Sequence, residues 1–141
     1  MLFSRLKKRL NRDRQRRDLA QPVFLIGAMK CGTNTIFHTL KNHPEVSIPR
    51  AKELDYFLRN ADASASGFRD NFKINENTKV LLDGTTQYSK FPDRPHCAVK
   101  IHKVFPDAKI IYMMRDPIAR AESQIAHHIA RGENATLENW R

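Results

Sequence analysis

The chain has 141 residues, of which 40% are hydrophobic and 28% are charged, as in ordinary soluble globular proteins, and its length fits one domain with a real core. No apolar stretch approaches the ~20 residues that cross a bilayer, and the N-terminus lacks the apolar region of a signal peptide. We therefore expect a cytoplasmic protein whose two cysteines, Cys31 and Cys97, are free thiols.

The formal net charge of +10 gathers at the N-terminus. Residues 1–18 contain eight Lys/Arg and two Asp, giving +6, and the remaining 123 residues supply +4. Apolar residues recur there at helical spacing: Leu2, Phe3, Leu6 and Leu10. We treat residues 1–20 as a basic leader and residues 21–141 as the domain. The leader is either a short amphipathic helix that weakly contacts anionic surfaces or a solvated, frayed segment.

Residues 22–37, PVFLIGAMKCGTNTIF, run from an apolar strand through a Gly- and Thr-rich turn into a helix. The apolar run Val23 to Ile26 ends at Gly27, which is the pattern of a strand buried on both faces of a parallel sheet. A helix that begins near Thr33 points unpaired N–H groups back at the turn. The turn is therefore a candidate anion site.

Several side chains of this turn can bind the same anion. Lys30 adds a full positive charge, and the side chains of Thr33, Asn34 and Thr35 add hydrogen bonds. Two glycines have the spacing of a nucleotide-binding P-loop, but Thr33 stands where that loop has its lysine. The alternative is a tight strand-to-helix turn with a solvated lysine.

The middle of the chain continues the alternation of strands and helices. We expect the first helix to end at His43-Pro44. The elements predicted after it are a short helix around Phe68 and Phe72, a strand at Lys79–Asp83 and a helix at Asp93–Phe105.

Lys109–Met114, KIIYMM, reads as another buried strand. It leads into Arg115, Asp116 as helix N-cap and Pro117 in the first turn, and the helix should run to about Arg131. Arg115 follows the carboxyl end of a strand, where open α/β sheets hold ligands, and its planar fork suits a phosphate. The alternative for Arg115 is an ion pair with a neighbouring carboxylate. The segment TLENW after Gly132 begins what looks like a further helix.

This alternation predicts an α/β protein with a P-loop-like three-layer fold, in which a central parallel sheet is flanked by helices on both faces. The strand ends at Gly27, Asp83 and Arg115 should face one crevice.

With these segments in order, the chain resembles the sulfotransferases that use 3′-phosphoadenosine 5′-phosphosulfate (PAPS), especially the branch with heparan sulfate and related bacterial sulfotransferases. The matching pieces are IGAMKCGTNTIFHTLKNHPEV (26–46), KELDYF (52–57), DGTTQY (83–88) and RDPIARAESQ (115–124). The resemblance covers most of residues 22–140. Because domains of that family continue past the last of these motifs, it also implies that the fold is incomplete at the C-terminus.

The resemblance implies a role for each matching residue. Lys30 would contact the bridging oxygen of the phosphosulfate and stabilise the leaving phosphate, Glu53 would be the catalytic base, and Arg115 with Ser123 would hold the 3′-phosphate. The cradle of the 5′-phosphate would comprise Lys30, Cys31, Gly32, Thr33, Asn34 and Thr35. The alternative for Glu53 is a surface carboxylate near Lys52 and Arg50.

Such a reaction transfers a sulfuryl group from PAPS to a hydroxyl or amine acceptor, expected on a carbohydrate or small metabolite. No metal is expected, because the sequence has no Cys/His cluster at ligand spacing. Gly84 and Asp55 depart from the family, which tends to have a lysine and a histidine or glutamine there, so the acceptor stays open. The alternatives are a non-catalytic nucleotide- or anion-binding fragment and, ranked last, a nucleic-acid-binding protein; we expect no specific nucleic acid. Oligomeric state does not follow from the sequence.

Overall fold

A parallel sheet lies at the centre of the computed structural model, which describes residues 19–132 together with Lys7 and Asn11. In this part of the chain the sheet has four strands in the order β2-β3-β1-β4. They are β1 (Gln21–Gly27), β2 (Val46–Ser47), β3 (Val80–Asp83) and β4 (Lys109–Tyr112). The helical elements are α2 (Thr33–Leu40), α3 (Tyr56–Arg59), α4 (Ala65–Arg69), the 3-10 helix η1 (Thr86–Ser89), α5 (Cys97–Val104) and α6 (Pro117–Ala130).

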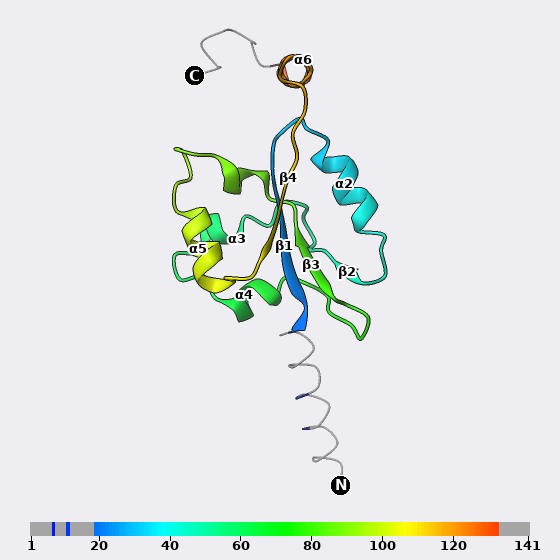
Figure 1. Ribbon diagram of the computed structural model, residues 1–141, viewed down its shortest axis with the longest axis vertical. Coiled ribbons are helices and arrows are strands. Elements are labelled where there is room, and N and C mark those ends of the chain that lie inside the picture. The colour runs from blue at the N-terminus through cyan, green and yellow to red at the C-terminus, as the bar shows by residue number, and fades with distance from the viewer. Residues whose placement is uncertain (1–6, 8–10, 12–18, 133–141) are drawn as a thin grey trace.

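Helices cover both faces of the sheet. Figure 1 shows α2 on one face and α3, α4 and α5 on the other. All three strand pairings are parallel. The predicted α/β class, with a central parallel sheet flanked by helices, is confirmed.

β1 is an interior strand of the sheet and is buried on both faces, as its apolar run predicted. Phe24 and Leu25 are consecutive and both are fully buried, because successive side chains of a strand point to opposite faces. Phe24 belongs to an aromatic core under α3, α4 and α5, which includes Phe57, Phe68, Tyr88 and Phe105. Leu25 packs on the other face with Phe37 and Leu82.

β4 differs from the sequence prediction. It forms where expected, but it is an edge strand rather than a buried one, and Ile110 and Tyr112 are 50% and 53% exposed. Ile111 packs against the cluster on the α2 face. Within residues 19–132 no strand lies beyond β4, and Figure 1 shows α6 past the carboxyl end of the sheet rather than on one of its faces. An apolar run therefore did not reveal whether the strand has a neighbour on each side.

Other differences concern boundaries and very short elements. α2 ends at Leu40 rather than at His43, and α5 begins at Cys97 rather than at Asp93, since Pro95 disfavours a helical conformation in the residue before it. Phe72 lies beyond α4 and forms an isolated bridge with Pro49. β2, α3 and η1 each have four residues or fewer, too few for a period to be read.

Two expectations fall outside the described residues, namely the amphipathic helix of the leader and the helix beginning at TLENW. Of the helices that are described, none has the length and apolar character needed to cross a bilayer.

Candidate functional site

The loop between β1 and α2 is joined to the end of β4. Ala28 N donates to Met113 O (2.9 Å), and Met113 N donates to Gly27 O (2.7 Å). The carboxyl ends of parallel neighbours meet at one edge of the sheet, so these bonds bring residues 28–32 beside the segment that begins α6. Two of the three strand ends predicted to share a crevice, those at Gly27 and Arg115, are therefore adjacent.

The loop has an unusual backbone. Lys30 has φ 66° and Gly32 has φ 87°, which is the left-handed region that favours glycine. For Lys30 this conformation costs on the order of 1 kcal/mol. Cys31 is 6% exposed, so its thiol packs inside the loop. The backbone is thus held in a shape that ordinary side chains avoid.

α2 begins directly after this loop without a side-chain cap. Gly32 is the N-cap residue, no side chain accepts a hydrogen bond from the first turn, and that turn contains no acidic residue. The N–H groups of the first turn and the positive end of the helix dipole are therefore available to an anion. Thr33 is buried here, whereas Asn34 and Thr35 are exposed.

Two arginines from the start of α6 contact the loop. Arg115 Nη1 donates to Lys30 O (3.4 Å) and Arg120 Nε donates to Met29 O (3.1 Å). The carboxylate next to Arg115 is engaged elsewhere, because Asp116 Oδ1 accepts from Ala119 N (2.9 Å) as the N-cap of α6. Among the described residues Arg115 therefore forms no ion pair with that carboxylate.

Arg120 was missed by the sequence reasoning. It lies inside the motif RDPIARAESQ, one helical turn after the N-cap. The available signal was a second arginine in the same motif, five residues after Arg115.

Glu53 is held by the segment that follows β3. Thr86 Oγ1 donates to Glu53 Oε1 (3.0 Å), Gly84 N donates to Lys52 O (3.1 Å), and Asp55 N donates to Thr85 Oγ1 (3.0 Å). These three bonds tie residues 52–55 to residues 84–86. Glu53 is therefore partly buried and fixed rather than a free surface carboxylate.

Lys52 connects this segment to α2. Its Nζ donates to Asn34 Oδ1 (2.5 Å), and burial lowers the pKa of Lys52 while the nearby Glu53 charge acts against that shift. The side chain of Lys52 thus reaches the first turn of α2, and it places Glu53 one residue away from that contact. Sequence reasoning gave Lys52 no role, although it precedes Glu53 in KELDYF.

A buried carboxyl group supports the turn after β3. Asp83 Oδ1 accepts from Thr85 N (3.0 Å) and Thr85 Oγ1 (2.6 Å), and Oδ2 accepts from Tyr88 OH (3.0 Å). Burial raises the pKa of Asp83 to about 6, although these hydrogen bonds oppose the shift. Burial, together with the charge of Asp83, also raises the pKa of Tyr88.

Ser123, which was predicted as a site residue, is not joined to the loop by any described contact. It lies on α6, about two turns after the N-cap, and it is partly exposed. No hydrogen bond among the described residues joins it to the loop. The structure therefore brings the loop from Lys30 to Thr35 together with Arg115, and joins the residue next to Glu53 to α2 through the Lys52 side chain. It leaves Ser123 further along α6.

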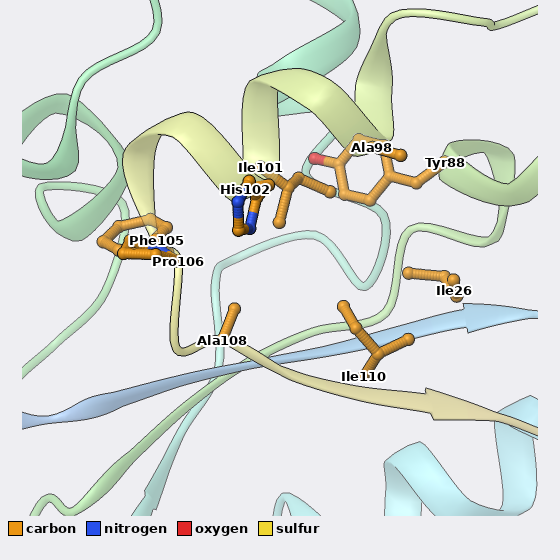
Figure 2. Close-up of a pocket in the computed structure, with 9 residues that line it drawn as sticks. All are labelled: Ile26, Tyr88, Ala98, Ile101, His102, Phe105, Pro106, Ala108 and Ile110. Atoms are coloured by element: carbon orange, nitrogen blue, oxygen red, sulfur yellow. The ribbon is translucent and has the colours of Figure 1, made fainter.

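An apolar cavity of about 180 Å³ lies apart from this loop, between α5 and the sheet. Figure 2 shows side chains of α5 facing Ile26 and Ile110 of the two strands. Its lining residues are Ile26, Tyr88, Ala98, Ile101, His102, Phe105, Pro106, Ala108 and Ile110. Such a lining lacks lysine and arginine, so this cavity is not suited to a phosphate.

Comparisons with a family model and with known proteins all point to the same family. Residues 55–140 match the model of the sulfotransferase family, a range that includes Arg115 and Ser123 and begins just after Glu53. The chain is 30% identical over 111 residues to the membrane-associated sulfotransferase kil1 of Dictyostelium discoideum, covering 75% of this chain and 23% of that protein. It is 26% identical over 109 residues to the mouse heparan sulfate glucosamine 3-O-sulfotransferase 6, covering 77% of this chain and 31% of that protein.

A solved structure agrees on the fold. The sulfotransferase from Alicyclobacillus acidocaldarius superposes with a TM-score of 0.67 at 24% sequence identity, covering 83% of this chain and 53% of that one. The chain thus spans about a quarter to a third of the curated relatives and about half of the solved relative. Because the family model matches more than half of its residues, the chain belongs to the sulfotransferase family.

Proposed function

We propose that this chain forms the donor-binding part of a sulfotransferase that moves a sulfuryl group from PAPS to a hydroxyl or amine. The observation that carries the proposal is the contact of Arg115 Nη1 with Lys30 O at 3.4 Å. A donor with a phosphosulfate at one end and a 3′-phosphate at the other needs two adjacent cationic sites. The loop before α2 supplies one and the start of α6 supplies the other.

The residues divide the binding between the two ends of the donor. The N–H groups at the start of α2 and the side chains of Lys30, Thr33, Asn34 and Thr35 bind the 5′-phosphate. Arg115, with Ser123 further along α6, binds the 3′-phosphate. Arg120 holds the loop in place through Met29 O.

The chemistry requires a base and stabilisation of the leaving group. The acceptor oxygen or nitrogen attacks sulfur and its proton passes to Glu53. The bond from sulfur to the 5′-phosphate oxygen breaks, and its electron pair stays on the phosphate, where Lys30 and the α2 amides stabilise the charge. The hydrogen bond from Thr86 orients the Glu53 carboxylate for this step.

For the acceptor we propose a carbohydrate or a small metabolite. Support comes from similarity to proteins whose names specify heparan sulfate glucosamine. Asp55, where the family tends to have a histidine or glutamine, is two residues from Glu53 in sequence, and its Oδ2 is ion-paired with Arg59 Nη2 at 3.0 Å. A different acceptor from heparan sulfate is consistent with that difference.

Binding of 3′-phosphoadenosine 5′-phosphate, the product form of the donor, tests the proposal directly. By calorimetry we expect Arg115→Ala to weaken binding roughly 10- to 100-fold, because a hydrogen bond to a charged group contributes about 1.5–3 kcal/mol. Arg94→Ala is the matched control, since Arg94 is an exposed arginine in the turn before α5, and it should change affinity less than about twofold. Equal affinities in wild type and Arg115→Ala would refute the assignment.

Transfer is tested separately in single turnover with the PAPS donor. Lys30→Ala should lower the rate more than the affinity, because charge on the leaving phosphate develops only as the bond breaks. If the wild-type chain binds the product nucleotide tightly but transfers no sulfuryl group, the chain is a non-catalytic nucleotide-binding fragment and not an enzyme.

A further inference from the structure

Lys52 occupies a position from which its charge reaches the start of α2. Its Nζ lies 2.5 Å from Asn34 Oδ1, and Asn34 is the second residue of that helix. The ammonium group is therefore one side-chain length from the N–H groups to which an anion would bind. Its contact is separate from those of Arg115 and Arg120, which reach the preceding loop from the start of α6.

The stem of Lys52 is packed rather than free. A Cβ atom built on Gly84 would lie 3.1 Å from Lys52 Cγ and 2.8 Å from Phe37 Cδ2. Gly84 therefore leaves the space through which the Lys52 stem passes, and its N–H fixes the backbone by donating to Lys52 O at 3.1 Å. A larger residue at position 84 would clash with Phe37 and would require the Lys52 stem to shift by a few tenths of an ångström.

The electrostatic surroundings of this ammonium favour an additional anion. In the described part of the chain no carboxylate lies within ion-pair distance of Lys52, and the partner of its Nζ is the neutral amide of Asn34. Burial already lowers the pKa of Lys52. The positive end of the α2 dipole lies close by and repels a cation. An anion between the helix start and the ammonium would relieve both effects.

We propose that Lys52, in the segment KELDYF, is a binding residue for the 5′-phosphosulfate end of the donor. The inference rests on the proposed function. It adds a second ammonium group, besides Lys30, at the end of the donor where the sulfur–oxygen bond breaks. In the bound state Nζ contacts the anion, and the Asn34 amide remains its lateral partner.

The decisive variant is Lys52→Met, which keeps the stem over Gly84 and removes the charge. Two probes distinguish the ends of the nucleotide: 3′-phosphoadenosine 5′-phosphate carries both phosphates, and adenosine 3′-phosphate lacks the 5′ one. We expect Lys52→Met to weaken the first probe about tenfold or more and the second less than twofold. Lys52→Arg, which restores a cation, should recover most of the lost affinity.

Lys41→Met is the matched control. Lys41 is the exposed C-cap residue of α2, so the same charge is removed at the far end of the same helix. It should leave both affinities within about twofold. Unchanged binding of the doubly phosphorylated probe in Lys52→Met overturns the inference while the proposed function stands. Absence of binding in wild type overturns both.

A measurement on the unsubstituted chain tests the same contact without depending on how well the variant folds. Amine-selective labelling followed by mass spectrometry reports the reactivity of Lys52 itself. We expect 3′-phosphoadenosine 5′-phosphate to protect Lys52 strongly and adenosine 3′-phosphate to protect it little. Equal labelling of Lys52 with and without the doubly phosphorylated nucleotide would contradict direct contact.

Discussion

Asp83 shows how one buried residue can set the geometry of a site that it does not enter. Its carboxylate accepts three hydrogen bonds from Thr85 and Tyr88. The turn that it fixes carries Thr86, which in turn holds Glu53. Such a carboxylate is costly to ionise, because it is fully buried and no cation is among the causes of its shift.

The raised pKa of Asp83 predicts a specific pH dependence of stability. Since the pKa is about 6 in the folded chain against an ordinary value of 3.8, the folded chain retains a proton that the unfolded chain releases. Its stabilising contribution is therefore complete below about pH 4 and is lost as pH rises through about 6. We expect the free energy of unfolding to fall by up to ~3 kcal/mol over this window from this group.

Denaturant unfolding from pH 3.5 to 7 checks this, with Asp83→Asn removing the titration. The difference in the free energy of unfolding between wild type and Asp83→Asn should depend on pH in this window with the slope expected for the uptake or release of roughly one proton. Asp107→Asn, at an exposed carboxylate, is the control and should leave the wild-type profile in place. Parallel profiles for wild type and Asp83→Asn would show that Asp83 does not titrate there.

At the scale of elements, the sequence predicted most of the strands and helices but not the very short elements β2, α3 and η1. The β1-loop-α2 unit and the α6 N-cap followed from local signals, namely an apolar run ending at Gly27 and the order Asp116-Pro117. β2 and α3 have two and four residues and are formed by tertiary contacts that a local pattern does not encode. The same holds within the site. The loop residues could be predicted from a local sequence pattern, whereas Lys52 contacts Asn34 and Arg120 contacts Met29, residues 18 and 91 positions away in sequence.

α6 is the element most dependent on its ends, because none of its residues is buried. Among the described contacts, the Asp116 cap stabilises its first turn and the two arginines join that end to the loop. We therefore expect Asp116→Ala to increase hydrogen exchange of α6 amides about 2- to 30-fold, which corresponds to a lost cap of about 0.5–2 kcal/mol. The exchange of β1 amides should stay unchanged.

Ser64→Ala provides the matched comparison. Ser64 Oγ caps α4 by accepting from Gly67 N (3.2 Å), and α4 contributes the fully buried Phe68 to the core. Loss of this cap should lower the global free energy of unfolding by about 1 kcal/mol. Should Asp116→Ala lower global stability as much as Ser64→Ala, α6 would be part of the cooperative core rather than an end-held helix.

At the scale of the whole molecule, charge and core are separate. The described core begins at Ala20, which is 2% exposed and whose carbonyl accepts from Arg69 Nη1 at 2.8 Å. Residues 1–18 hold +6 of the net +10, and the described contacts of the candidate site involve residues 27 to 120. We therefore expect the leader to act on the site through its long-range electrostatic field.

Deleting residues 1–18 separates these two contributions. We expect the deletion to change the melting temperature by less than about 2 °C, because the Arg69 bond to Ala20 is kept. At 0.15 M salt the affinity for 3′-phosphoadenosine 5′-phosphate should stay within about threefold, since the Debye length is then about 8 Å. At 0.01 M salt, where that length is about 30 Å, loss of the leader should weaken the same binding clearly more. A melting temperature lowered by 10 °C or more, or a lost affinity at 0.15 M salt, would place the leader inside the domain, because screened charge alone cannot produce either result.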